Sequence, residues 1–186
     1  MIFEVTRALS IGIDESNHGR FPEIFVAVRT YRKSDIKPKD GLSKCRENGE
    51  IYAILEGRDF RYITVSSEMG AELSLDETKV LVFSSFIRYF DAATRNPLSR
   101  VIIDGYVEDR LFEDVGRLIY PISLPLIIAE TKADKIYPIV NVADRVANLL
   151  HRHHHNKRNE KLAQYAGKRL DLSLEDYLGL LRAEKN

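Results

Sequence analysis

The stretch IIAETKADKIYPIVNVADRVANLL, residues 127–150, holds the most informative pattern in the chain. It predicts a short buried strand that ends near Glu130, followed by a loop that holds Asp134. Pro138 then opens a helix, because proline is tolerated at the first helical position. Apolar residues at helical spacing line one side of this helix: Ile139, Val142, Val146 and Leu149. The stretch therefore predicts a strand-loop-helix unit with an acid in its loop.

Before this unit, the first half of the chain has the pattern of strands. Residues 8–14 and 24–31 are apolar and β-branched, and the polar segment between them suits a turn between antiparallel neighbours. Residues 51–55 and 61–65 predict one or two more strands. Ser74 and Glu77 form a capping-box pattern ahead of a helix that should end near residues 96–97.

The elements that follow alternate between strand and helix. VIIDG at 101–105 predicts a short strand ending on an acid, and residues 107–119 predict a helix. Ser173 with Asp176 resembles a further helix start, before an amphipathic stretch at 174–181. An antiparallel meander followed by βαβα crossovers predicts an α/β fold, with a mixed central sheet flanked by helices and a helical C-terminal tail.

Acidic residues stand where the predicted strands end. Asp14 and Glu15 follow IGI, Asp104 follows VII, and Asp134 lies just beyond IIAE. Ligand sites of α/β sheets gather at strand ends, so these acids can converge in space. Carboxylates brought together repel unless a cation neutralises them, and their hard oxygen atoms favour Mg²⁺ or Mn²⁺. Taken singly, an acid after a strand is more often a cap, a turn residue or a surface charge.

The 127–150 stretch resembles the corresponding segment of type 2 ribonuclease H enzymes, especially archaeal ones, which typically reads like IIAEHKADAKYPVVSAASIIAKV. That family opens with a strand ending in IDEAGRG and has a second acid in a strand reading like hVDG. The counterparts here are IGIDESNHGR and VIIDG. The resemblance implies a ribonuclease H-like domain over residues 1–155, with a helical C-terminal extension at 156–186 packed on the same domain.

The resemblance also implies a site. Asp14, Glu15, Asp104 and Asp134 match the four carboxylates that hold two Mg²⁺ or Mn²⁺ ions in that family, and two such ions can drive hydrolysis of a phosphodiester bond. The expected activity is a divalent-metal-dependent nuclease acting on RNA, RNA/DNA hybrid or structured nucleic acid. The alternative is a non-catalytic module of the same fold that binds nucleic acid or a protein.

The sequence departs from the family at two places. The glycine-arginine-glycine loop that grips the RNA-DNA junction is replaced by residues 16–20, SNHGR, and the small pair of the following helix is replaced by Ala143 and Asp144. Asp144 is a candidate fifth metal ligand. Its alternative is a place on a solvated stripe with Asn141, Asn148 and Arg152. The chain fits an uncharacterised archaeal family within the superfamily better than an orthodox type 2 enzyme.

Charge and hydropathy set further limits. The net charge is zero, but seven Lys or Arg residues and one acid lie between positions 145 and 169. Cations in and around this segment are expected to contact phosphates of a nucleic acid: Arg20, Lys132, Arg145, Arg152, Lys157 and Arg158. Tyr137 is expected either to stack on a base or sugar or to pack in the fold. The histidines at 151–155 suit a basic face or a transition-metal site. No run of apolar residues is long enough for a membrane helix, and the first residues lack the pattern of a signal peptide, so we expect a cytoplasmic protein with no membrane partner.

Overall fold

The computed structural model describes residues 8–16, 20–42, 50–94, 96–156, 163–172 and 179. Its centre is a five-stranded mixed sheet with strand order β3-β2-β1-β4-β5. The strands are β1 (Leu9–Ser16), β2 (Glu23–Thr30), β3 (Phe60–Val65), β4 (Leu98–Asp104) and β5 (Leu126–Glu130). The β1-β2 and β2-β3 pairs are antiparallel, while β1-β4 and β4-β5 are parallel. This arrangement confirms the predicted meander followed by crossovers.

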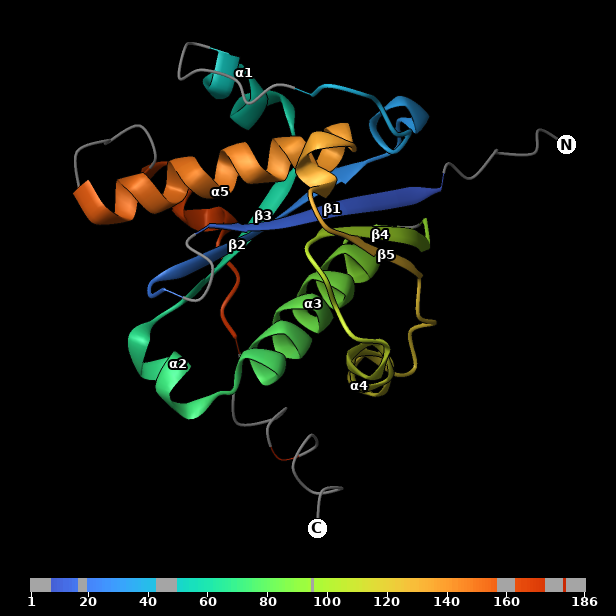
Figure 1. The fold of residues 1–186 in the computed structure, drawn as a ribbon, viewed down its shortest axis with the longest axis vertical. Helices are drawn as coiled ribbons and strands as arrows, with labels where there is room; N and C mark the ends of the chain where they lie inside the picture. The colour runs from blue at the N-terminus through green and yellow to red at the C-terminus, as the bar shows by residue number, and fades with distance from the viewer. Residues whose placement is uncertain are drawn as a thin grey trace, which may run out of the picture.

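Helices cover both faces of the sheet (Figure 1). They are α1 (Glu50–Gly57), α2 (Ser67–Glu72), α3 (Leu75–Ala92), α4 (Asp109–Ile119) and α5 (Pro138–Asn156), with 3-10 turns η1 (Lys33–Asp35), η2 (Ala133–Lys135) and η3 (Ala166–Lys168). α3 and α4 pack on one face around a core that includes Phe83 and Ile103, and α5 packs on the other around Ile102 and Val146. The two cores hold the sheet rigidly between layers.

The start of α3 follows the predicted capping box. The Ser74 hydroxyl accepts from the Glu77 backbone N–H at 3.2 Å, and the Glu77 carboxylate accepts from the Ser74 N–H at 2.8 Å. These two bonds satisfy backbone donors that have no partner inside the helix. α5 likewise begins at Pro138, as the sequence predicts.

The expected strand at 51–55 is wrong, because this segment lies in α1. Leu55 is 1% exposed and packs, with Ile54, against the core under α5. At the outer edge of β3, part of the strand pairs with the segment after α5: Tyr62 bridges to Arg169, and the Leu170 N–H donates to the Tyr62 carbonyl at 2.8 Å.

The helix α2 was not predicted from the sequence.

The described chain after α5 packs against the domain. Tyr165 is buried, and its ring lies 5.8 Å from the ring of Phe60, centroid to centroid. Residues 163–172 thus contact the sheet, while the division into a domain at 1–155 and an extension at 156–186 stays a prediction. The predicted helix at 174–181 falls outside the described residues except for position 179. In the part of the chain that the structure describes, no helix combines the length and apolar character needed to cross a bilayer.

Candidate metal centre

Asp14 and Asp104 lie beside each other on neighbouring parallel strands. Ile13 pairs with Ile103, so the next residue of each strand is an aspartate at the same level. Side chains alternate along a strand, and Ile102 belongs to the core under α5. Both aspartates therefore leave the sheet on the α5 side, at the carboxyl ends of β1 and β4, where the sequence predicted convergence.

Asp134 reaches this place through a sharp turn after β5. Lys132 has a left-handed backbone with φ of 67°, which reverses the chain into η2. Such a conformation is unusual for a residue other than glycine. The buried Asn141 side chain then donates to the Asp134 carbonyl at 2.8 Å. This bond ties η2 to the first turns of α5 and fixes the backbone that carries Asp134.

Asp144 is brought in by the close approach of α5 to β1. A Cβ at Gly12 would lie 2.9 Å from the Ile139 backbone carbonyl carbon, so only glycine allows this contact. Asp144 is 8% exposed, and Asn148 donates to its Oδ1 at 2.6 Å. The solvated-stripe interpretation is therefore wrong for Asp144 and also for Asn141, which is 4% exposed.

The electrostatics of Asp14 reflect its burial and three neighbouring acids. Burial raises the pKa of Asp14 to about 9, and the charges of Asp104, Asp144 and Asp134 add to the shift. Asp14 is 4% exposed. Its Oδ1 accepts from the Glu15 N–H at 2.6 Å, whereas its Oδ2 is buried without a hydrogen-bond partner among the described residues. A buried carboxylate with an unpaired oxygen, facing three others, favours a cation.

Glu15 leaves the strand on the opposite face. It pairs in register with Phe25, which lies in the core under α3, whereas Asp14 pairs with Val26 under α5. The groups that raise the pKa of Asp14 do not include the Glu15 carboxylate. The backbone of Glu15 contributes to the site through its N–H, and its side chain starts from the far side of the sheet.

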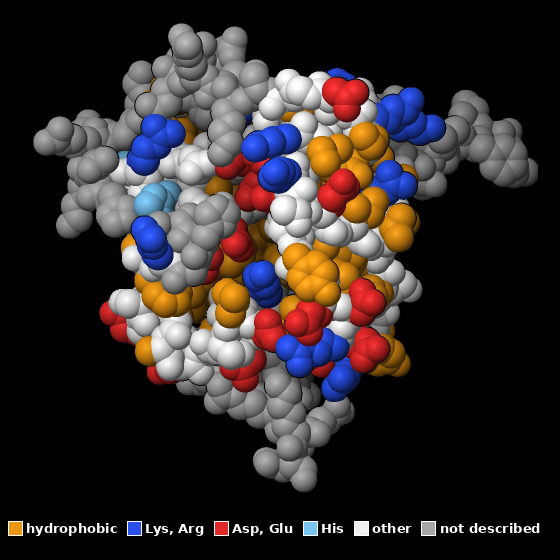
Figure 2. Space-filling model, viewed as in Figure 1, with side chains coloured by type: hydrophobic (Ala, Val, Ile, Leu, Met, Phe, Trp, Pro, Cys, Tyr) orange, Lys and Arg blue, Asp and Glu red, His pale blue; other side chains and the backbone are white. Residues whose placement is uncertain are grey.

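The donor set suits a hard divalent cation, but its side chains are not gathered as a coordination shell. Within the described ranges, no three His, Cys, Asp or Glu side chains stand together in a way that could hold a metal ion. Figure 2 shows Asp and Glu side chains near the middle of one face of the molecule, with Lys and Arg side chains around them.

The predicted nucleic-acid contacts have mixed placements. Arg20, Lys132 and Arg152 are exposed and Arg145 is half-buried, while Lys157 and Arg158 lie outside the described residues. Tyr137 is 8% exposed and its hydroxyl donates to the Glu130 carboxylate at 3.1 Å. Burial makes Tyr137 a packing residue, as its alternative interpretation held, and leaves little of its ring for stacking.

Three supporting residues were missed by the sequence reasoning. Asn141 and Asn148 hold Asp134 and Asp144, and Glu130 pairs in register with Asp104 on the same face of the sheet. The role of Asn148 had a signal in the sequence, since it stands four residues after Asp144. Such i, i+4 pairs face each other on a helix.

The sheet order, the covering helices and the acids at the ends of β1 and β4 define a ribonuclease H-like α/β domain. Solved structures of this class resemble the chain: RNase HII in its complex with PCNA from Archaeoglobus fulgidus, at 18% identity over 95% of this chain and 90% of that one, with a TM-score of 0.58. Ribonuclease H2 from Pyrococcus horikoshii OT3 gives 16% identity over 95% and 88%, with a TM-score of 0.60.

A third similar structure, Bst-RNase HIII in complex with Mn²⁺, shares 16% identity over 88% of this chain and 57% of its own, with a TM-score of 0.54. No protein-family model and no curated protein matches the sequence. At these identities the likeness establishes the fold: the chain has a ribonuclease H-like fold.

Proposed function

We propose that this protein is a divalent-metal-dependent nuclease that hydrolyses phosphodiester bonds in RNA, RNA/DNA hybrid or structured nucleic acid. The observation that carries the proposal is the burial of Asp14 against Asp104, Asp134 and Asp144, with one carboxylate oxygen unpaired. The Mn²⁺ complex of a structure with the same fold supports the choice of cation.

The proposed ligands are Asp14, Asp104 and Asp134, with Asp144 as a further member. Glu15, which the resemblance also implied as a ligand, contributes its backbone N–H instead, because its side chain leaves the strand on the other face of the sheet. Two Mg²⁺ or Mn²⁺ ions, when bound, supply activation of the attacking water and neutralisation of the leaving oxygen. The protein's own side chains and backbone hold the ligand carboxylates in place. Asn148 orients Asp144, and the Glu15 N–H keeps one oxygen of Asp14 directed along the strand.

Cations near the acids would position the substrate by its phosphates, which fixes register without reading sequence. Lys132 immediately precedes η2, and Arg145 follows Asp144 on α5. Arg20 and Arg152 are more exposed, and with Lys157 and Arg158 they complete the proposed set.

The test is cleavage of a labelled RNA/DNA hybrid and of single strands in Mn²⁺. We expect Asp14→Asn and Asp134→Asn to lose activity by about a hundredfold or more, whereas the exposed Asp40→Asn should match wild type. Equal rates in all three variants, or cleavage that persists in EDTA, would refute the metal mechanism.

Asp144 has its own test. Asp144→Asn keeps an Oδ1 that can accept from Asn148, so the helix should fold as in wild type while one negative charge is lost. If Asp144 is a ligand, the variant needs more Mn²⁺ for half-maximal activity and binds Mn²⁺ more weakly in an equilibrium titration. An unchanged Mn²⁺ requirement would assign Asp144 to packing.

A second candidate is a non-catalytic module that binds nucleic acid or a protein. It is favoured by the absence, within the described chain, of acids gathered to hold a metal, and by the altered loop at 16–20. This candidate predicts nucleic-acid binding that weakens with salt and persists in EDTA. The nuclease predicts cleavage in Mn²⁺ that the aspartate variants lose.

A further inference from the structure

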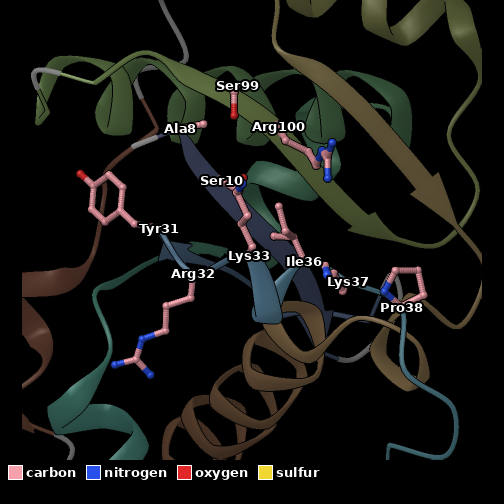
Figure 3. Close-up of a pocket in the computed structure, with 10 residues that line it drawn as sticks. All are labelled: Ala8, Ser10, Tyr31, Arg32, Lys33, Ile36, Lys37, Pro38, Ser99 and Arg100. Carbon is pink, nitrogen blue, oxygen red and sulfur yellow. The ribbon is translucent and has the colours of Figure 1, made fainter. Parts of the chain in front are cut away.

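A cavity of about 620 Å³ lies at the end of the sheet opposite the aspartates. It is bounded by the first residues of β1 and β4, by Tyr31 just after β2, and by the loop at 31–38 (Figure 3). Ser10 lines the cavity and stands four residues before Asp14 on β1, which is roughly 13 Å along a strand. The cavity is therefore a separate place from the candidate metal centre.

Four cations line the cavity, Arg32, Lys33, Lys37 and Arg100, and no carboxylate of the described residues lines it with them. Lys33 and Lys37 come from the loop, and Arg100 comes from β4. Neither lysine nor Arg100 forms an ion pair within the described part of the chain. In Figure 3, Arg100 reaches in from β4, while the Arg32 side chain points away from the other residues.

The loop's own acid is directed away from this group. Asp35 is 7% exposed; its Oδ2 accepts from the Arg58 guanidinium at 2.6 Å and from the Thr30 hydroxyl at 2.7 Å. These partners hold the pKa of Asp35 below its usual value despite its burial. Since Asp35 is neutralised inside the fold, the cavity wall is left with an excess of positive charge.

Much of the remaining wall is apolar and includes one aromatic ring, with Ser10 and Ser99 as its polar members. Tyr31, Ile36 and Pro38 border the same space as the cations. The Arg29 guanidinium lies 5.6 Å from the centroid of the Tyr31 ring, a cation–π contact. A volume in the range of roughly 300–1,000 Å³ with apolar walls and a few charged groups is typical of small-ligand sites.

We propose that this cavity binds a nucleotide unit, with its phosphate at Lys33, Lys37 and Arg100 and its nucleoside against Tyr31, Ile36 and Pro38. Phosphate is an anion that lysine and arginine side chains bind well together, and a planar base matches an aromatic wall. The unit has two sources, a free mononucleotide or the phosphorylated end of a strand. The inference does not depend on the nuclease proposal.

The experiment is a calorimetric titration of the full chain at low salt in EDTA, so that no metal contributes. The probes are adenosine 5′-monophosphate, adenosine, inorganic phosphate, and a short oligonucleotide with and without a 5′-phosphate. The variant is Lys33→Ala/Lys37→Ala; both lysines are exposed, so it should melt as wild type does. Lys39→Ala is the matched control, because Lys39 is exposed in the same loop and does not line the cavity.

We expect the mononucleotide to bind wild type and Lys39→Ala alike, to bind the double variant at least about tenfold more weakly, and to bind better than adenosine or phosphate. Binding of the 5′-phosphorylated oligonucleotide alone, with the same dependence on the lysines, supports a strand end as the source. Phosphate binding as tightly as the mononucleotide overturns the nucleoside part. Absence of binding, or equal binding by the double variant, overturns the site.

Asp134→Asn separates this proposal from the nuclease. In EDTA it should bind the mononucleotide as wild type does, because Asp134 lies at the other end of the sheet. A loss of nucleotide binding in that variant would mean that the ligand occupies the aspartate site, and the cavity proposal would then be wrong.

Discussion

Replacing the Asp14 carboxyl group by an amide should make the metal-free protein more stable at neutral pH. Asp14→Asn keeps the size of the side chain and the acceptor for the Glu15 N–H. It removes a carboxylate whose pKa is raised from 3.8 to about 9 by burial and by Asp104, Asp144 and Asp134. The substitution therefore relieves a cost that the folded chain carries when no cation is present.

The sign and the size follow from linkage. Between pH 3.8 and about 9 the unfolded chain has lost the Asp14 proton and the folded chain keeps it, so the free energy of unfolding falls by about 1.36 kcal/mol per pH unit. Below pH 3.8 both states keep the proton, and Asp14 does not lower the free energy of unfolding. At pH 7, about three pH units higher, Asp14 lowers the free energy of unfolding by roughly 4 kcal/mol.

Urea unfolding in EDTA at several pH values between 5 and 9 measures this. Wild type should lose stability as the pH rises, and Asp14→Asn should be more stable at neutral pH and show a flatter dependence. The exposed Asp40→Asn is the control and should follow wild type. Adding Mn²⁺ should stabilise wild type more than Asp14→Asn, since binding to the folded state alone raises its stability.

Parallel curves for wild type and Asp14→Asn would refute the reasoning. They would mean that Asp14 titrates as it does in the unfolded chain, so the aspartates would not be close enough to need a cation.

Three further changes test how the fold positions the site. Gly12→Ala should cost about 1–3 kcal/mol in urea unfolding, because its methyl group would press on the Ile139 backbone at 2.9 Å. Asp35→Asn should cost about 2 kcal/mol near neutral pH; since the pKa of Asp35 is lowered, its contribution is present above the usual carboxyl range and lost in acid, where variant and wild type should converge. Ser74→Ala should cost about 1 kcal/mol, seen as a lower melting temperature, because α3 loses its cap.

Much of the candidate site could be predicted from local sequence. Asp14 follows Ile-Gly-Ile and Asp104 follows Val-Ile-Ile, and carboxyl ends of parallel strands meet at one edge of a sheet. Their side-by-side register follows from the pairing of β1 with β4. The Ser74-Glu77 cap was equally local, since both partners lie within one turn.

Features that depend on packing could not be predicted in this way. Whether Asp144 faces solvent or the sheet is decided by the rotation of α5 on β1, which the contact at Gly12 sets. Residues 51–55 include two β-branched isoleucines, yet they form α1 and pack Leu55 and Ile54 against the core under α5. The outer edge of β3 is bridged instead by Arg169, far along the chain. The basic cavity joins a loop to Arg100 and has no signature in either segment.

The pairing of Tyr62 with Arg169 and Leu170 has a consequence for solubility. An uncovered edge strand offers a row of hydrogen-bonding groups to any other chain and is a template for aggregation. The segment after α5 covers part of the β3 edge in this way. Truncating the protein before residue 163 would expose this part of the edge, so truncated versions made for crystallisation should self-associate through β3.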